Sequence, residues 1–204
     1  MNTELTSTPA VGRPRSERTR KAILRAAREL MLERDISEIS VEEIARRAGA
    51  GKATIYRWWG SKELLGLDSI RAVWEESTPA VIDSGTLEGD LLELILPWTR
   101  ELGARRYGRV VASFIAAAQR DPEFAAAYRR EFVAARRERG RCIFERAIAR
   151  GEIAAATDVE ASLDLIYGPV YHRLLHGHAA VDDTFVGTLV ATVVAGVKSE
   201  GRRR

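Results

Sequence analysis

Apolar side chains recur every three or four residues over most of the chain, which is the spacing of amphipathic α-helices. The first such segment begins near Ser16, and its apolar stripe consists of Ile23, Leu24, Ala27, Leu30 and Met31. No segment shows sustained alternation of period two. The pattern therefore predicts an all-α protein of about nine helices, the later ones at residues 87–102, 105–119, 122–150, 158–177 and 183–197.

Start and stop signals divide the region after the first helix into short helices. Ser40 precedes an apolar run and has Glu43 three residues later, which is the spacing of a capping box. Gly49 suits the left-handed position after a helix, a further helix is expected at about residues 52–58, and the next begins with Ser61 as its cap. Two helices joined by a tight glycine turn are typical of a helix-turn-helix, whose second helix enters the major groove of DNA.

Polar side chains on the second helix of this unit point outward by its periodicity, while Ile55 is the buried anchor. The basic side chains match the two-acceptor edge of guanine, and a threonine matches a base or a thymine methyl group. The aromatic rings and the lysine that opens the next helix suit phosphates. The alternative is two ordinary core helices joined by a glycine turn. The candidate DNA-binding residues are Ser40, Lys52, Ala53, Thr54, Tyr56, Arg57, Trp58 and Lys62.

Charge is divided unevenly along the chain. Residues 1–60 carry 12 Lys and Arg against 8 Asp and Glu, whereas residues 61–200 carry 17 against 21. A basic first quarter on an acidic body is the distribution expected of a DNA-binding head, although an Arg-rich solvated helix face gives the same count. We expect a disordered leader at 1–12, a DNA-binding domain at 13–60, a helical body at 61–200, and a basic tail at 201–204.

Few residues offer other chemistry. The single Cys142 allows no internal disulfide, the first residues lack an apolar signal core, and no apolar run approaches the ~20 residues of a membrane span. A cytoplasmic protein without membrane contact is expected. His172 and His176 stand one turn apart, but a dimer-seam or surface position fits them better than a metal site, and neither a metal nor a cofactor is expected.

Residues 13–65 resemble the N-terminal domain of the TetR family of bacterial transcriptional regulators over their whole length. The resemblance is carried by the basic first helix, the turn IARRAG, the segment KATIYRWW and the segment SKELL that opens the linking helix. It implies that the helix with Lys52, Thr54, Tyr56 and Trp58 is the recognition helix on a double-stranded operator. One departure is Gly51, where the family usually has Ser or Thr; Gly caps a helix nearly as well, but a hydroxyl contact to phosphate is lost.

The resemblance also implies that the body binds a small-molecule effector and forms a homodimer through its last two helices. The final helix has a broad apolar face that one partner helix cannot cover, and pairing across a twofold axis would bury it. Gly168-Pro169 predicts a kink in the helix before it. The candidate dimer residues are His172, Leu175, Phe185, Leu189 and Val193.

Aromatic side chains lie on the inward stripes of four successive body helices. Together they form either an apolar cavity with tyrosine hydroxyls as polar handles or an ordinary packed core. The sequence favours a ligand-released repressor. A DNA-binding regulator without a small-molecule ligand remains the main alternative, and a helical enzyme is disfavoured because no nucleophile–base set or phosphate loop is found. The candidate pocket residues are Trp98, Phe114, Tyr128, Phe132 and Tyr167.

Overall fold

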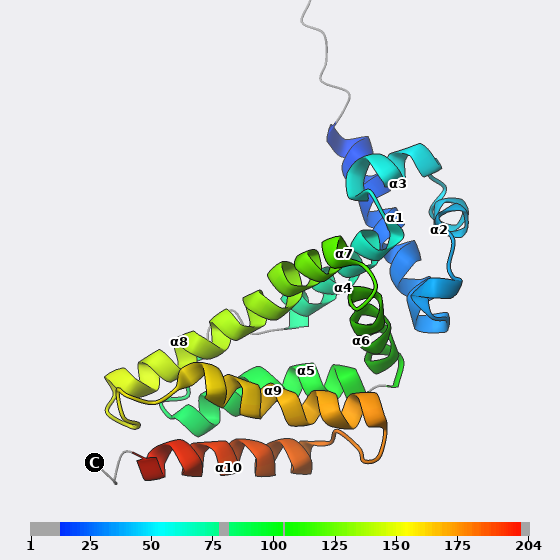
Figure 1. Cartoon of the computed structure of the whole chain (residues 1–204). Coiled ribbons are helices and arrows are strands. Elements are labelled where there is room, and N and C mark those ends of the chain that lie inside the picture. Colours follow the sequence, from blue (N-terminus) through cyan, green and yellow to red (C-terminus); the bar gives the residue numbers. More distant parts are fainter. Residues whose placement is uncertain (1–12, 78–81, 104, 201–204) are drawn as a thin grey trace, which may run out of the picture.

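The computed structural model describes residues 13–77, 82–103 and 105–200, and within them the chain is helical with no strand, which confirms the predicted fold class. Figure 1 shows a helical head at one end of the molecule, a helix that leads from this head to the body, and the remaining helices packed together in the body. The head and linking helices are α1 (Arg13–Glu33), α2 (Val41–Ala48), α3 (Lys52–Trp59) and α4 (Lys62–Ser77).

The body contains one long helix with an irregular segment near its start. α7 passes into α8 through a six-residue π-helical segment, η2, so the helix predicted from Pro122 to Arg150 is continuous. Counted in this way, the described residues form nine α-helices and a 3-10 turn, η1 (Ile36–Glu38). The body elements are α5 (Leu87–Gly103), α6 (Arg105–Ala118), α7 (Pro122–Tyr128), η2 (Arg129–Ala134), α8 (Ala135–Ala149), α9 (Val159–His176) and α10 (Asp183–Glu200).

Local capping explains several helix ends. The Ser40 hydroxyl accepts the Glu43 backbone N–H at 3.2 Å, while the Glu43 carboxylate pairs with Arg34. Gly49 adopts φ +62° at the end of α2, where a side chain would be strained. Asp121 caps α7 by accepting two backbone N–H groups, with Pro122 at the first helical position. These are the ends that the sequence predicted.

The body core forms around α5, and α10 packs along it (Figure 1). Apolar residues at helical spacing along α5 are buried, namely Leu91, Leu94, Ile95, Trp98 and Leu102. The apolar face of α10 is also covered within one chain, because five of its valines pack into this core. The expectation that a single chain leaves this face uncovered is therefore wrong for four of its residues, Val190, Val193, Val194 and Val197.

Two predicted segments, the leader at 1–12 and the tail at 201–204, lie outside the described residues. α9 runs through Pro169 from Val159 to His176 without ending at it. In the described part of the chain, no helix combines the length and the apolar character that crossing a membrane requires.

Candidate functional site

The recognition helix α3 is short and is anchored at its centre. Ile55 is fully buried, and Gly60 ends the helix with φ +74°. At its start, Gly51 makes no side-chain capping bond, but its carbonyl accepts the Thr54 N–H at 3.0 Å. The helix therefore forms without the hydroxyl cap.

The outer face of α3 exposes most of the predicted DNA-binding side chains. Lys52, Ala53, Tyr56 and Arg57 are exposed, Tyr56 by 52%. The Lys52 ammonium forms an ion pair of 2.5 Å with Glu42 of α2, so this cation has an acidic competitor for phosphate. Thr54 and Trp58 are half-buried.

Ser40 and Lys62 also have structural roles within the head. Ser40 caps α2, and the Lys62 ammonium donates to the carbonyl oxygens of Ile39 at 2.8 Å and of Ser37 at 3.3 Å. Lys62 thus ties the start of α4 to the loop before α2. An ammonium has three donors, and a contact from Lys62 to phosphate stays a prediction.

A carboxylate on α4 joins three helices of the molecule, which the sequence did not indicate. Asp68 accepts from Arg20 of α1 at 2.5 Å and from the Trp59 indole N–H at the end of α3 at 3.0 Å, and its other oxygen accepts from Arg71 at 2.9 Å. We call Arg20, Trp59, Asp68 and Arg71 the Asp68 cluster. Burial raises the pKa of Asp68, but the hydrogen bonds from Trp59 and Arg71 and the charge of Arg20 outweigh it and hold the pKa below its usual range.

A second contact links the head to the body. The Ser113 hydroxyl of α6 donates to the Asp35 carboxylate at 2.5 Å, and this bond is the main cause of the lowered pKa of Asp35. Asp35 also caps η1 through the Ser37 N–H at 2.8 Å. The loop after α1 is therefore held against α6.

A cavity of about 390 Å³ lies in the body between α4, α5, η2, α8 and α9. This volume falls within the ~300–1,000 Å³ of small-molecule sites. We call it the main cavity because three of the predicted pocket aromatics line it, although hollows of about 480 and 510 Å³ lie elsewhere on the described structure. A side cavity of about 380 Å³ shares Arg136 and Tyr167 with it. The described lining of the main cavity is Arg71, Leu94, Ile95, Trp98, Arg130, Glu131, Phe132, Ala135, Arg136, Arg139 and Tyr167.

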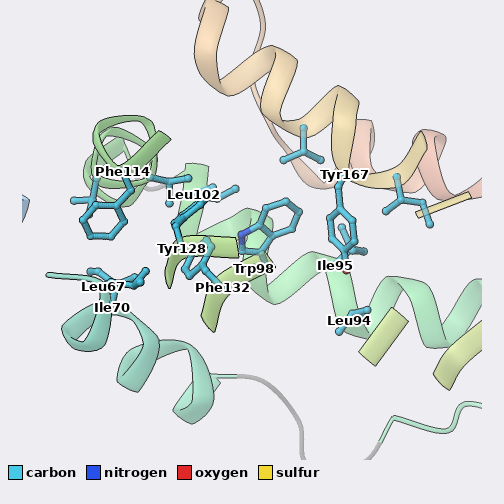
Figure 2. Packing of buried hydrophobic residues seen from close by; sticks show 14 of the residues in the cluster. Leu67, Ile70, Leu94, Ile95, Trp98, Leu102, Phe114, Tyr128, Phe132 and Tyr167 are labelled. Atoms are coloured by element: carbon cyan, nitrogen blue, oxygen red, sulfur yellow. The ribbon is translucent and has the colours of Figure 1, made fainter. Parts of the chain in front are cut away.

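Four of the five predicted pocket aromatics line a cavity. Trp98, Phe132 and Tyr167 line the main cavity, and Tyr128 lines the side cavity (Figure 2). Phe114 lines neither of them. It is fully buried, packs on Phe124 with ring centres 5.8 Å apart, and lies beside α4, so its assignment to a pocket is wrong because it fills the junction between α4, α6 and α7.

Arg136 is the functional candidate that the sequence reasoning missed. It is 8% exposed, and its guanidinium carbon lies 4.1 Å from the Trp98 ring centre and 4.8 Å from that of Phe132. One of its N–H groups donates to the Tyr171 hydroxyl at 2.8 Å. Burial lowers the pKa of Arg136, yet an arginine starts so far above neutrality that it stays charged. Burial also raises the pKa of Tyr167 to about 12, so this phenol stays protonated.

The predicted dimer residues fall into three groups. His172 and Leu175 are exposed, Leu175 by 48%. Phe185 and Leu189 are half-buried, while Val193 is only 7% exposed and belongs to the core of its own chain. The rings of His172 and His176 lie 4.7 Å apart, but no set of three or more metal-ligating side chains among the described residues is arranged to hold an ion.

Comparison with known proteins agrees with this division into head and body. Residues 23–66 match the family model described as bacterial regulatory proteins, tetR family, and residues 81–193 match the model described as tetracyclin repressor-like, C-terminal domain. The chain is 39% identical over 188 residues to the HTH-type transcriptional regulator YdeS of Bacillus subtilis (strain 168), covering 92% of this chain and 94% of that protein.

Solved structures show the same fold. The crystal structure of the TetR family transcription regulator SCO0332 has a TM-score of 0.74 and 36% identity, covering 88% of this chain and 98% of that one. The regulator FadR from Bacillus subtilis, solved in complex with stearoyl-CoA, has a TM-score of 0.70 at 19% identity, covering 87% and 98%, and shows the fold alone. With a recognition helix, a helical body and these matches over nearly its whole length, the chain belongs to the TetR family of DNA-binding transcriptional regulators.

Proposed function

We propose that the protein is a homodimeric repressor that is released from a palindromic operator by a small molecule bound in the main cavity. The observation that carries this proposal is the position of Arg71, which lines the cavity and also belongs to the Asp68 cluster. The recognition helix is joined to the same cluster through Trp59. A ligand in the cavity thus has a short physical path to the element that binds DNA.

The dimer is proposed to form through the exposed faces of α9 and α10. Leu175 supplies an exposed apolar side chain on α9, and the exposed positions of α10 include small side chains that allow close approach of a partner helix. The latter are Thr188, Ala191, Thr192 and Ala195. A twofold axis through this face would place two heads on successive major grooves, which are about 34–36 Å apart on one side of the duplex.

Release of DNA requires that the ligand prefer the conformer that does not fit the operator. A preference of about a hundredfold corresponds to about 3 kcal/mol of coupling. Movement of α4 would first shift the Arg71 side chain and would then weaken the hydrogen bonds that Asp68 accepts from Arg20 and Trp59. The head would then turn relative to its partner and lose the operator spacing.

The test begins with selection of duplexes from a random library, followed by fluorescence anisotropy with the selected sequence. We expect a palindrome whose half-sites are about one helical turn apart and an affinity that falls steeply as salt rises. A panel of small molecules is then added to the complex. A panel without any effect on operator affinity would overturn ligand control and leave the DNA-binding role in place. The presence of the main cavity argues against the alternative of a DNA-binding regulator without a small-molecule ligand.

A further inference from the structure

The described wall of the main cavity carries an excess of positive charge. It contains four arginines, Arg71, Arg130, Arg136 and Arg139, against the single carboxylate of Glu131. Arg71 pairs with Asp68 at 2.9 Å and lies 3.9 Å from Glu131. Arg130 lies 2.9 Å from Glu131, so these two acids pair with Arg71 and Arg130. Because a cavity attracts ligands of the opposite charge, this lining favours an anion.

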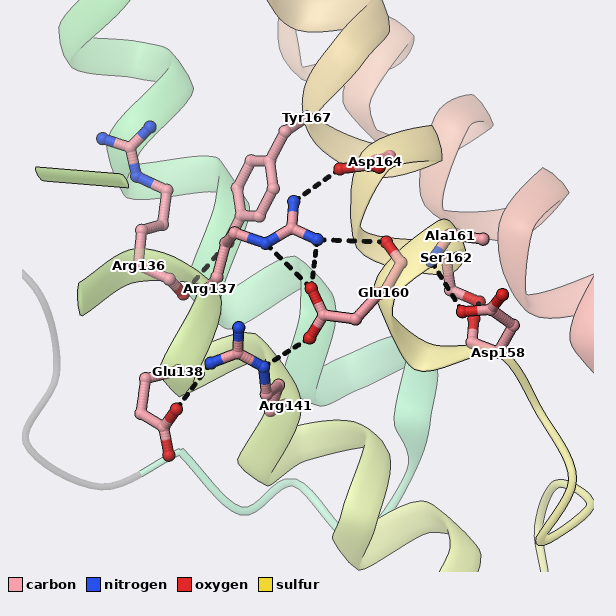
Figure 3. Close-up of polar contacts among 10 residues, drawn as sticks. All are labelled: Arg136, Arg137, Glu138, Arg141, Asp158, Glu160, Ala161, Ser162, Asp164 and Tyr167. Atoms are coloured by element: carbon pink, nitrogen blue, oxygen red, sulfur yellow. Dashed lines mark hydrogen bonds and ion pairs between the residues drawn. The ribbon is translucent and has the colours of Figure 1, made fainter. Parts of the chain in front are cut away.

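Arg136 is the cation placed deepest in this wall, and its surroundings differ from those of its neighbour in sequence. Arg137 turns toward α9, where it donates to Asp164 at 2.5 Å and to Glu160 at 3.1 Å (Figure 3). Arg136 turns the other way, into the rings of Trp98, Phe132 and Tyr167, and stands between the main and side cavities. Removing a charge from water is costly, and the rings and the Tyr171 hydroxyl offset part of that cost. The position of Arg136 in the wall of both cavities also places this cation beside any ligand bound there.

The guanidinium is held in one orientation before any ligand arrives. Its central carbon lies over the Trp98 ring, 4.1 Å from the ring centre, and its Nη1 atom donates to the Tyr171 hydroxyl at 2.8 Å. A planar guanidinium presents its N–H groups as a fork that matches the two oxygens of a carboxylate. Orientation before binding reduces the entropy lost on association. The group is thus prepared for a carboxylate rather than for a neutral polar atom.

The rest of the cavity wall selects the body of the ligand. Leu94 and Ile95 of α5 give apolar surface, while the Trp98 and Tyr167 rings meet edge to face with centres 5.5 Å apart. Aromatic walls of this kind accept flat rings in stacked or edge-on contact. We propose that the effector is a small carboxylic acid with a flat apolar body, whose carboxylate pairs with Arg136; this proposal rests on the proposed role of the main cavity.

The experiment compares two probes of equal shape, naphthalene-2-carboxylate and naphthalene-2-carboxamide, by isothermal titration calorimetry on the full-length protein at pH 7. The wild type should bind the acid at least about tenfold more tightly than the amide, which is about 1.4 kcal/mol. Arg136→Met should abolish this preference. Arg129→Met is the matched control, because Arg129 is exposed on the same continuous helix and lies outside the described cavity lining; it should keep the preference.

Arg136→Lys keeps a charge but loses the fork, and it should retain only part of the preference, which guards against a Met variant that fails to fold. Equal binding of the two probes by the wild type, or a preference that survives Arg136→Met, would overturn the carboxylate proposal. If the carboxylate proposal failed in this way and the amide still lowered operator affinity, ligand control of DNA binding would stand without a carboxylate ligand. Failure of both probes to bind would overturn the proposed ligand class, and the wider effector panel would still decide ligand control separately.

Discussion

Replacing Asp68 by Asn tests whether the Asp68 cluster holds the DNA-binding head to the body. The carboxylate accepts from α1, α3 and α4 through Arg20, Trp59 and Arg71. An amide has one acceptor oxygen and adds an N–H₂ donor, so at least one guanidinium would face a donor. The attraction of two positive charges for Asp68 is lost at the same time.

The expected loss follows from the exposure of the partners. Both arginine side chains are 40% exposed, and exposed ion pairs contribute only about 0.2–1 kcal/mol each. The Asp68 side chain is 16% exposed, and a hydrogen bond to a charged group such as that from Trp59 contributes about 1.5–3 kcal/mol. Because the amide oxygen can still accept one bond, we expect a loss of about 2 kcal/mol in the free energy of unfolding. For a chain of 204 residues this lowers the Tm by roughly 4–8 °C.

The assay is thermal unfolding followed by circular dichroism at pH 7 and near pH 3, with operator affinity measured in parallel at pH 7. The pKa of Asp68 is lowered in the folded protein, so its stabilising effect is complete above the unfolded value of about 3.9 and is lost as the pH falls through the folded pKa. The difference between wild type and Asp68→Asn should therefore shrink at the lower pH.

The matched control for this variant is Asp164→Asn, because Asp164 is 73% exposed and pairs with Arg137 away from the head. Its effect on the Tm should be small. Equal melting temperatures and equal operator affinities for the two variants would refute the role given to the Asp68 cluster.

Four further substitutions test the head and the dimer. Glu42→Gln removes the acidic partner of Lys52 and with it a negative charge on the proposed DNA-facing surface. Operator affinity in anisotropy titrations should rise two- to fivefold, on the order of 0.5–1 kcal/mol. Unchanged affinity would place Lys52 away from DNA. In urea unfolding, Gly49→Ala should lower the free energy of unfolding by about 1 kcal/mol, because Gly49 has φ +62°. Gly51→Ser should leave the free energy of unfolding equal or slightly higher, because Gly51 has φ −82° and serine can cap the helix. Leu175→Glu should give a monomer in light scattering and weaker operator binding, and a dimer with full affinity would exclude the proposed α9–α10 surface.

The helices were predictable because their signals are local. Asp121-Pro122 and Gly49 mark helix ends through bonds to residues at most four positions away, and a single sequence contains all of that information. The π-helical segment at 129–134 was not predicted, because the apolar spacing over residues 122–150 is that of one continuous helix and does not mark a π-helical turn. The apolar face of α10 was identified, but its coverage by α5 depends on tertiary packing that periodicity does not encode.

The difference between local signals and contacts made by tertiary packing also applies to the functional sites. The recognition helix could be located from its turn and its outward polar residues, whereas Asp68 binds Arg20 from 48 positions away. Arg136 was not predicted to be buried, because it lies in an arginine-rich run of the kind found on a solvated helix face. It does stand four residues after Phe132, in the buried stripe that continues to Gly140 and Phe144, and this spacing was the available signal. Phe114 shows the reverse case, since periodicity marks a residue as inward without telling a cavity wall from a packed core.

Arg71 connects the charge of the proposed ligand to the proposed release of DNA, because this arginine both lines the main cavity and belongs to the Asp68 cluster. Arg71 contacts both Asp68 and Glu131, so an added carboxylate in the cavity would compete with these two acids for a cation that helps to hold the head. A neutral ligand of the same shape would lack this effect. About 3 kcal/mol is needed for a hundredfold change in operator affinity, and the Asp68 cluster in each protomer is expected to contribute about 2 kcal/mol. If the Asp68 cluster forms only in the operator-binding conformer, its partial loss in both protomers of the proposed dimer would shift the equilibrium by the required amount without unfolding either head.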